Sequence, residues 1–242
     1  MRYLLLAAGM GKRLGQAHGG LPKCLIEIGG ETLIGRLLRQ IRSHDPHPDI
    51  RVVLGYRSDA VAPAVEGCRI VLNPFFDITG INASLWFARD AFDAPLMVIH
   101  GDVVLGEDLA RDLFTAAAES LVAYDSSVLD PKEINVAVAD GRVTRFGVNY
   151  AGYSGAYAGV VKLSARAAAL FGETLDRRIR RGFNEARTYY FFVMRRLIAE
   201  PGVAFAPFDF ARYRWQEIDY PRDIEAARLR VGTGVQARSE HG

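Results

Sequence analysis

Short apolar runs alternate with amphipathic stretches along the first half of the chain. The apolar runs at 3–8, 51–55, 69–72 and 96–100 have the length of buried strands. Stretches in which apolar residues recur with helical spacing lie between and after them, at 32–44, 59–65, 82–92 and 107–119. Strands that alternate with helices of this length predict an α/β fold, with a mainly parallel sheet flanked by helices and ligands at the carboxyl ends of the strands.

The second half of the chain has a different pattern. A buried strand at 120–125 precedes a hairpin, 134–138 and 143–146, and the apolar run 155–163 returns to the sheet. Two helices follow. The second, 188–199, is apolar around most of its circumference, so it is either buried or covers a ligand or a partner. A strand at 203–208 and a helix that starts at Pro221 complete the pattern.

No linker or internal repeat divides the chain, so we expect one domain over residues 1–231 with a single mixed, mainly parallel sheet. Residues 120–231 would form a small lobe inserted on the sheet that residues 1–119 build. Residues 232–242 are polar and without pattern, and we expect a frayed tail there. Half of the 242 residues are hydrophobic (50%), which is enough to bury a core of this size.

A glycine-rich loop follows the first strand and carries several cations. Its glycines let backbone N–H groups approach phosphate oxygens, while Arg13 offers a planar donor fork and Lys23 a mobile point charge. The spacing of Gly9, Gly11 and Gly15 is one residue too long for the dinucleotide fingerprint, and no Gly-Lys is followed by Ser or Thr as in a Walker A loop. A solvated surface turn is the alternative for such a loop taken alone.

Two aspartates follow extended segments. Asp102 comes directly after strand 96–100, at the carboxyl edge of the sheet near the glycine-rich loop, and Asp219 ends the segment that starts at Trp215. Such a pair can hold Mg²⁺, which commonly takes one or two carboxylates plus phosphate oxygens. Taken singly, Asp102 reads equally well as a turn residue and Asp219 as a helix-start residue.

Together these motifs resemble the signature of the sugar-nucleotidyltransferase-like family, L-A-A-G-x-G-x-R-(L/M) followed by P-K. The matching segments are 6–14 and Pro22-Lys23, and Asp102 and Asp219 match the family's two metal-binding places. The resemblance covers residues 1–231 and implies a Rossmann-like nucleotidyltransferase fold, with residues 1–119 binding the nucleotide and residues 120–231 the acceptor. It implies an enzyme with Lys23 and Arg13 as catalytic residues, Asp102 and Asp219 as Mg²⁺ ligands, and nucleotide contacts from Leu6, Ala8, Gly9, Gly11 and Asp102.

A third feature narrows the resemblance. Residues 73–76, N-P-F-F, followed by 82–86, N-A-S-L-W, are similar to a segment of small CTP-dependent members that make CDP-choline or CMP-phosphonates. This similarity implies that Asn82 and Ser84 bind the nucleotide. It also implies transfer of CMP from CTP to a small phosphonate or phosphorylated alcohol, such as phosphocholine, by in-line attack on the α-phosphate with release of pyrophosphate. The aromatic stretch 189–194 contains no acid, which favours a phosphonate over a choline head group.

Candidate acceptor-binding residues are aromatic or basic. The aromatic candidates are Trp86, Tyr189, Tyr190 and Trp215, although aromatic residues at helical spacing are more often part of the core. The basic run 177–181 is either a solvated face, or a lid or a contribution from the partner subunit of a homodimer that brings Arg180 or Arg181 to the acceptor. His100 is predicted to be a packed residue rather than an acid–base catalyst.

Composition and charge argue against several other functions. The formal net charge of +2 argues against a nucleic-acid-binding protein, and no apolar stretch approaches the roughly 20 residues that span a bilayer. No signal-peptide pattern is present and the two cysteines lie far apart, so we expect a cytoplasmic protein. Two alternatives stay open: a sugar-1-phosphate or inositol-phosphate nucleotidyltransferase, and a non-catalytic relative that only binds a nucleotide.

Overall fold

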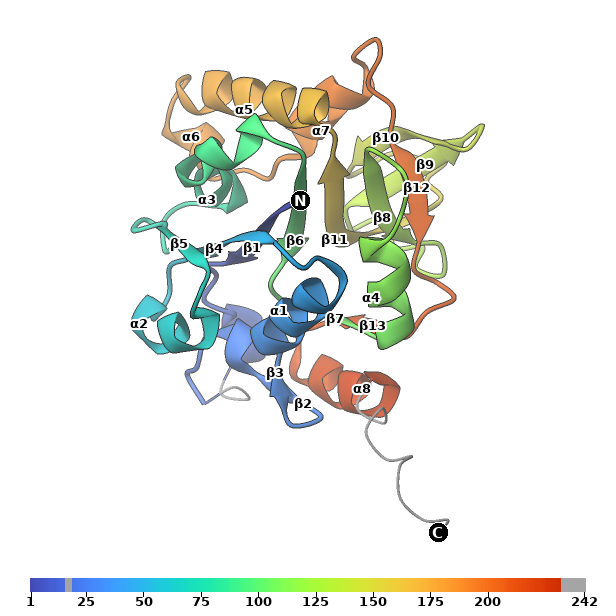
Figure 1. Ribbon diagram of the computed structural model, residues 1–242. Helices are drawn as coiled ribbons and strands as arrows, with labels where there is room; N and C mark the ends of the chain where they lie inside the picture. Colours follow the sequence, from blue (N-terminus) through green and yellow to red (C-terminus); the bar gives the residue numbers. More distant parts are fainter. Residues whose placement is uncertain (16–18, 232–242) are drawn as a thin grey trace.

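A twisted sheet with a parallel centre organises the protein, whose computed structural model describes residues 1–15 and 19–231 (Figure 1). The sheet has nine strands, seven of them in the order β10-β9-β11-β6-β1-β4-β5, with β8 beside β11 and β12 beside β8. The parallel centre consists of β6 (Leu96–His100), β1 (Arg2–Ala7), β4 (Asp49–Leu54) and β5 (Arg69–Leu72). The predicted α/β fold with a mixed sheet and a mainly parallel core is confirmed.

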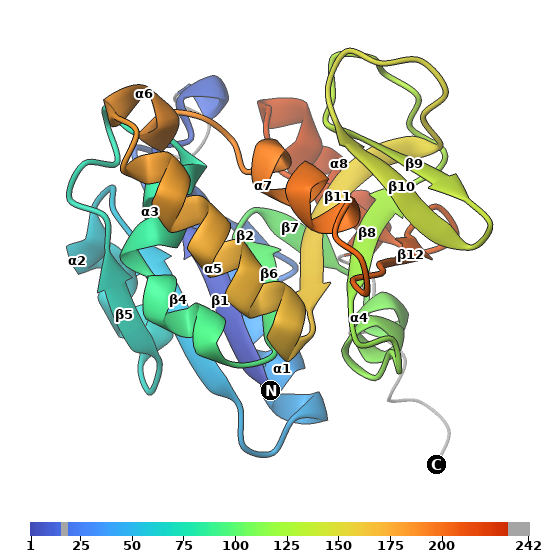
Figure 2. The ribbon, with the colours of Figure 1, turned by 90° about the horizontal axis from the view of Figure 1, so that it is seen from above.

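The second half of the chain extends the same sheet with mostly antiparallel strands. β11 (Gly155–Leu163) runs antiparallel to β6 and to β8 (Leu121–Asp125), and β12 (Ala206–Asp209) lies parallel to β8. The predicted hairpin forms from β9 (Asn135–Ala139) and β10 (Arg142–Gly147), which project from the body of the molecule in Figure 2. The division of the domain at residue 119 stays a prediction.

Helices cover both faces of the sheet (Figures 1 and 2). One face carries α1 (Leu33–His44) and α4 (Glu107–Phe114), and the other carries α3 (Ile81–Phe87), α5 (Ala165–Ile179) and α7 (Phe191–Ile198). Because successive side chains of a strand point to opposite faces, every apolar residue of β1 is used. Tyr3 and Leu5 belong to the core on the α1 side, and Leu4 belongs to the core on the α5 side.

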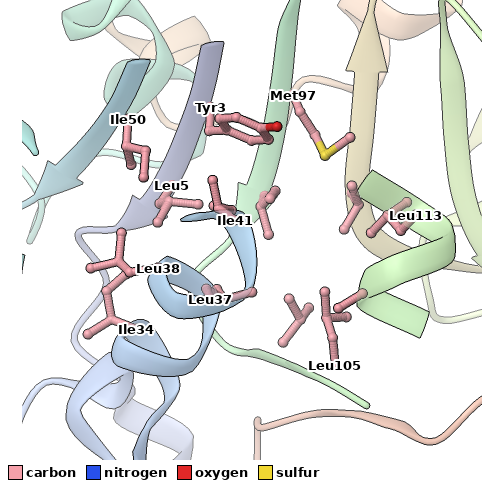
Figure 3. Close-up of a cluster of buried hydrophobic side chains, with 14 of the residues drawn as sticks. Tyr3, Leu5, Ile34, Leu37, Leu38, Ile41, Ile50, Met97, Leu105 and Leu113 are labelled. Atoms are coloured by element: carbon pink, nitrogen blue, oxygen red, sulfur yellow. The ribbon is translucent and has the colours of Figure 1, made fainter. Parts of the chain in front are cut away.

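Helix α1 shows how the sequence pattern produces the first of these cores. The Thr32 hydroxyl accepts a hydrogen bond from the Gly35 N–H at 3.1 Å and caps the helix. The fully or almost fully buried side chains of the helix face β1, β4 and α4 in Figure 3; those labelled there are Ile34, Leu37, Leu38 and Ile41. This packing fixes the sheet edge at which β1 and β6 end.

A short pair of strands, of which the sequence predicts only the second as an extended segment, closes this edge. β7 (Val103–Leu105) and β13 (Trp215–Glu217) pair antiparallel, with Val103 opposite Glu217, and the Ile218 N–H donates to the Asp102 carbonyl at 3.0 Å. α8 (Pro221–Val231) then begins at Pro221, as predicted. Ile218 and Val104 share one small buried cluster with Leu14 of the glycine-rich loop. The pairing therefore holds the residue after Ile218 beside Asp102.

Several predicted elements differ from the observed ones at their ends. The helix predicted at 82–92 splits into α3 and a 3-10 turn (Arg89–Asp93), and the one predicted at 107–119 ends at Phe114, where the Thr115 hydroxyl bonds back to the Arg111 carbonyl. The aromatic helix begins at Phe191 instead of residue 188. The predicted tail, 232–242, lies outside the described residues.

None of the helices within the described residues is long and apolar enough to cross a membrane.

The remaining elements are short. The helix predicted at 59–65 consists of an α-helical turn followed by a 3-10 turn. These short elements are β2 (Glu27–Ile28), β3 (Glu31–Thr32), α2 (Ser58–Val61), α6 (Phe183–Ala186) and 3-10 turns at Lys12–Leu14, Lys23–Leu25 and Ala62–Val65.

The close approach of Gly106 to the start of β13 allows a test of this architecture. A Cβ at Gly106 would meet the Arg214 carbonyl oxygen at 2.7 Å, so the Gly106→Ala variant must push the two segments apart. We expect its free energy of unfolding, measured with denaturant, to fall by about 1–3 kcal/mol. Gly9→Ala is the control, because a Cβ there meets nothing within 4 Å. Equal losses in the two variants would contradict this reading of the β7–β13 contact.

Candidate functional site

Four charged side chains from distant parts of the sequence meet where β1 and β6 end. Arg13 lies in the loop after β1, Lys23 in the 3-10 turn Lys23–Leu25, Asp102 directly after β6, and Asp219 after β13. Arg13 and Asp219 are 206 positions apart in the sequence. The parallel centre of the sheet and the β7–β13 pairing bring them together, as the sequence predicts for the edge at which strands end.

The ammonium group of Lys23 lies between the two aspartates. Lys23 Nζ donates to Asp102 Oδ2 at 2.8 Å and to Asp219 Oδ1 at 2.6 Å. Arg13 Nη1 donates to the other oxygen of Asp219, Oδ2, at 2.9 Å. The Lys23 side chain is only 15% exposed, whereas that of Arg13 is 66% exposed. Lys23 is therefore largely enclosed between the two aspartates, whereas the Arg13 side chain is exposed to solvent at the opening of the site.

The pKa values of Lys23 and Asp102 reflect their contact with each other. Burial alone lowers the pKa of Lys23, but the charges of Asp102 and Asp219 outweigh burial, and the pKa ends above its usual value. Burial raises the pKa of Asp102, and the Lys23 ammonium more than offsets that effect, so this pKa ends below its usual value. Both groups are thus held in their charged forms.

The two aspartates fit a divalent metal ion. Asp102 Oδ1 is buried and has no hydrogen-bond partner among the described residues, so it is a carboxylate oxygen left over for a ligand. Carboxylate oxygens beside a site for phosphates are the ligands that Mg²⁺ takes in proteins. Lys23 now contacts both aspartates in the region where such an ion would lie, and the metal-binding role of Asp102 and Asp219 stays a prediction.

Glu217 is a further carboxylate of the site, and the sequence analysis did not single it out. One oxygen of Glu217, one of Asp102 and one ring nitrogen of His100 lie within 4.8 Å of one another. Burial, followed by the charges of Asp102 and Asp219, raises the pKa of Glu217 to about 8. A positive charge beside such a group would favour its ionised form. The signal in the sequence was its spacing, two residues before Asp219 in an extended segment.

Three adjoining cavities open onto these charged groups. The first, here called the phosphate-loop cavity, has a volume of about 380 Å³ and contains the glycine-rich loop. Its lining residues include Leu6, Gly9, Gly11, Arg13, Lys23, Phe76, Thr79, Asp102 and Asp219. A smaller side cavity of about 240 Å³ shares Leu6, Gly9 and Asp102 with it. The third, the acidic cavity, has about 290 Å³ and shares Asp219 with the first.

The predicted nucleotide-binding residues lie on the first two cavities, with one exception. Leu6, Ala8, Gly9, Gly11, Ser84 and Asp102 line the phosphate-loop cavity, the side cavity or both. Asn82 lines none of the three. Its amide nitrogen donates to the Glu185 carbonyl at 3.1 Å and to the Thr188 hydroxyl at 2.8 Å, which ties α3 to the loop after α6. A direct nucleotide contact by Asn82 stays a prediction without support from its position.

The predicted acceptor-binding residues are more scattered. Trp215 lines the acidic cavity. The Trp86 indole donates to Asp176 on α5 at 2.9 Å, and Arg180 pairs with the same carboxylate at 2.6 Å with a side chain 72% exposed. Neither of these residues nor Arg181 lines any of the three cavities, because Trp86 packs against α5 and the basic run lies at the end of that helix. This placement favours the solvated face over the lid.

Tyr189 and Tyr190 contact His100, which lies beside the site. Their hydroxyls lie 3.1 and 3.2 Å from His100 Nε2, and the Tyr190 hydroxyl also lies 2.6 Å from that of Tyr157. Tyr190 is only 1% exposed and belongs to the core. Burial lowers the pKa of His100, which favours the neutral ring. These contacts agree with the expectation that His100 is a packed residue, and they leave Tyr190 no access to a ligand.

Comparison with known proteins identifies the family. Residues 3–170 match the MobA-like NTP transferase domain. The chain belongs to this family. Its members are nucleotidyltransferases that act on a nucleoside triphosphate and a phosphorylated acceptor and typically use a divalent metal ion.

Two relatives extend over nearly the whole chain. A "Bifunctional IPC transferase and DIPP synthase" of Rubrobacter xylanophilus is 29% identical over 237 residues, which are 94% of this chain and 51% of the relative. A "CMP-5'-(3-aminopropyl)phosphonate synthase" of Streptomyces rubellomurinus is 28% identical over 250 aligned positions, which cover 95% of this chain and 38% of the relative. The chain thus spans about half or less of the length of these two proteins.

Two solved structures share the fold. The CTP:phosphocholine cytidylyltransferase LicC of Streptococcus pneumoniae superimposes with a TM-score of 0.78 at 21% identity, covering 94% of this chain and 97% of LicC. The inositol-1-phosphate CTP transferase of T. maritima has a TM-score of 0.72 at 19% identity, covering 98% of each chain. At such identities these likenesses establish the fold and no more.

Removal of Lys23 should expose the metal-binding character of the two aspartates. In the Lys23→Ala variant, Asp102 and Asp219 face each other without the ammonium, and we expect a loss of about 1–3 kcal/mol in stability, less than for a fully buried pair because both carboxylates are partly exposed. MgCl₂ should raise the melting temperature of this variant more than that of the wild type, since a cation that binds the folded state stabilises it.

Thermal unfolding with and without MgCl₂ measures this difference. Lys132→Ala is the matched control, because it removes the same charge from an exposed position that lines none of the three cavities. An equal response to MgCl₂ in all three proteins would contradict a cation site between Asp102 and Asp219.

Proposed function

We propose that this protein is a cytidylyltransferase that transfers CMP from CTP to a small phosphonate or phosphorylated alcohol, of the phosphonate or phosphocholine class, and releases pyrophosphate. The observation that carries the proposal is the position of Lys23 and Asp219. Lys23 lines the phosphate-loop cavity, and its partner Asp219 lines both that cavity and the acidic cavity. A triphosphate in the first cavity and an acceptor in the second would meet at these two side chains.

Each cavity has the chemistry that this assignment needs. The phosphate-loop cavity offers Gly9 and Gly11, the latter with φ of 61°, together with Arg13 and Lys23, which suits a triphosphate. The side cavity would take the base, near the Ser84 hydroxyl. CTP is the proposed nucleotide because a relative and two similar folds bear names that refer to CMP or CTP.

The proposed reaction needs no nucleophile from the protein. An anionic oxygen of the acceptor forms a bond to the α-phosphorus of CTP, the bond from that phosphorus to the bridging oxygen breaks, and the electron pair leaves with pyrophosphate. Catalysis then consists of positioning and charge neutralisation. When bound to Asp102 and Asp219, Mg²⁺ would supply positive charge to the phosphate oxygens.

Basic side chains of the protein would neutralise further negative charge on the phosphates and the acceptor. Lys23 would leave the two aspartates and donate to the α-phosphate or the acceptor, and Arg13 would reach the β- and γ-phosphates from the mouth of the site. Asp102 and Asp219 would lose their present partner at the same moment as they gain another cation. Each aspartate would therefore have a cation beside it both before and after the nucleotide binds.

Inositol phosphate is the second candidate acceptor, because one of the similar folds belongs to an inositol-1-phosphate CTP transferase. A non-catalytic nucleotide-binding relative is disfavoured, since Arg13, Lys23, Asp102 and Asp219 are all present and in mutual contact.

A substrate screen tests the proposal directly. We expect pyrophosphate release with CTP and Mg²⁺ in the presence of phosphocholine, 2-aminoethylphosphonate or a hydroxyalkylphosphonate, and little release with UTP, GTP or ATP. Inositol 1-phosphate and glucose 1-phosphate belong in the same panel. Release that depends on a sugar phosphate and UTP would replace this proposal, and the absence of release with every pair would refute it.

The two aspartates should behave as one unit. If they hold a single Mg²⁺, Asp102→Asn and Asp219→Asn should each lower kcat by roughly 10²-fold or more, and the double variant should be little worse than either. Steady-state kinetics at saturating CTP, with circular dichroism to verify folding, measures this. Losses that multiply in the double variant would show that the carboxylates act independently.

A further inference from the structure

The acidic cavity, with a volume of about 290 Å³, has more acidic than basic lining residues. It shares Asp219 with the phosphate-loop cavity and is lined by residues of the loop after β8 and of the start of α8. Five acidic residues line it together with aromatic ones. These residues are Asp125, Glu133, Glu217, Asp219 and Asp223, with Tyr157, Trp215 and Tyr220.

Three of the five carboxylates already have partners within the protein. Asp219 is bound by Lys23 and Arg13. Asp125 accepts hydrogen bonds from the Trp215 indole at 2.8 Å and from the Ser127 hydroxyl. Asp223 accepts from two backbone N–H groups at the start of α8, at 2.9 and 2.7 Å. These three carboxylates therefore do not require a ligand.

Glu217 and Glu133 differ from the other three. Within residues 1–15 and 19–231, neither carboxylate has a hydrogen bond or an ion pair. The two arginines that line the cavity form no ion pair with either glutamate among the described residues. Arg230 donates to Gln216, and Arg222, whose side chain is 83% exposed, lies by Asp223 and the Tyr220 ring. A carboxylate that is enclosed without a counter-charge is costly, so the partly buried Glu217 favours a cation beside it, while the exposed Glu133 adds negative charge to the same cavity.

We propose that the acidic cavity receives the positively charged end of the acceptor, an amine or a quaternary ammonium, and that Glu217 and Glu133 determine this specificity. This inference rests on the proposed function, because the other end of the same acceptor must reach Lys23 and the α-phosphate. The acceptor is then a small zwitterion, with a phosphonate or phosphate at one end and a cation at the other.

The aromatic residues of the cavity support a cation. Trp215 and Tyr157 line the same space as Glu217, and ring faces attract ammonium groups. The bond from the Trp215 indole to Asp125 fixes the orientation of that ring. Glu217 lies at the inner end, within 4.8 Å of Asp102, and the exposed Glu133 lies at the mouth. One carboxylate near the transferred phosphate and one farther out would orient an acceptor with charges at both ends.

The proposal bears on the choice between a phosphonate and a choline-like head group. The aromatic stretch 189–194 contains no acid that could hold a cation. The structure supplies acids from the loop after β8 and from β13 instead. Glu133 and Glu217 lie far apart in the sequence, so no local pattern predicts that they line the same cavity.

A pair of acceptors that differ only in charge tests the proposal. We compare kcat/KM for 2-aminoethylphosphonate and 2-hydroxyethylphosphonate, with CTP and Mg²⁺ held constant. The amine should be preferred by roughly 10-fold or more, the size expected for one charge-assisted hydrogen bond. Glu217→Gln and Glu133→Gln should each bring the ratio closer to one. Glu173→Gln, which removes the same charge from an exposed position on α5, should leave the ratio unchanged.

The ratio separates this role from a metal-binding role of Glu217. A variant that only disturbs Mg²⁺ lowers turnover of both acceptors alike and leaves their ratio as it was. An unchanged ratio in both glutamate variants, or a wild-type enzyme that transfers CMP to the two phosphonates equally well, would overturn the inference while the proposed function stands. If no acceptor supports pyrophosphate release, the proposed function fails. Equilibrium dialysis of the two phosphonates then decides whether the cavity still selects the amine.

Discussion

The contact of one ammonium group with two carboxylates is the constraint on which the site depends. Asp102 and Asp219 would repel each other if both were charged and nothing lay between them, and Lys23 is held within 2.8 Å of the first and 2.6 Å of the second. A triphosphate brings its own negative charge and, with Mg²⁺, a replacement cation for the aspartates. Mg²⁺ would thus replace the ammonium as the counter-charge of the two aspartates, so that neither partly buried carboxylate is left without a cation.

The surrounding fold holds this contact in register. Asp219 follows β13, which is only three residues long and pairs with β7, so its position depends on the hydrophobic cluster beneath it. Leu14 of the glycine-rich loop, Val104 of β7 and Ile218 all belong to that cluster. Because the same buried side chains anchor the loop with Arg13 and the segment with Asp219, the basic and acidic parts of the site cannot shift independently.

The sequence predicted the strong periodic elements and the motifs attached to them. β6 and β11 have the predicted bounds, since continuous apolar runs are unambiguous when both faces of a strand are buried. β5 also has the predicted bounds, although it lies at the edge of the sheet and is largely exposed. Helix ends were predicted less well, because 3-10 turns such as Arg89–Asp93 share the spacing of α-helices over one turn. β7 has no periodicity of its own, and Trp86 packs against α5 although its position beside a motif indicated a ligand. The acidic cavity combines a loop and a three-residue strand, for which no local pattern exists.

The phosphate-loop cavity and the acidic cavity differ in charge and share Asp219. Lys12, Arg13 and Lys23 line the first cavity together with three aspartates, whereas five acidic residues and two arginines line the second. A molecule with one anionic and one cationic end would lie across Asp219 more favourably with its cationic end in the acidic cavity, because reversal would place the anionic end among the five acidic residues. The orientation that remains puts the anionic oxygen beside Lys23, where the α-phosphate would be. The difference in charge between the two neighbouring cavities can therefore both select a zwitterionic acceptor and orient its anionic oxygen toward the α-phosphate.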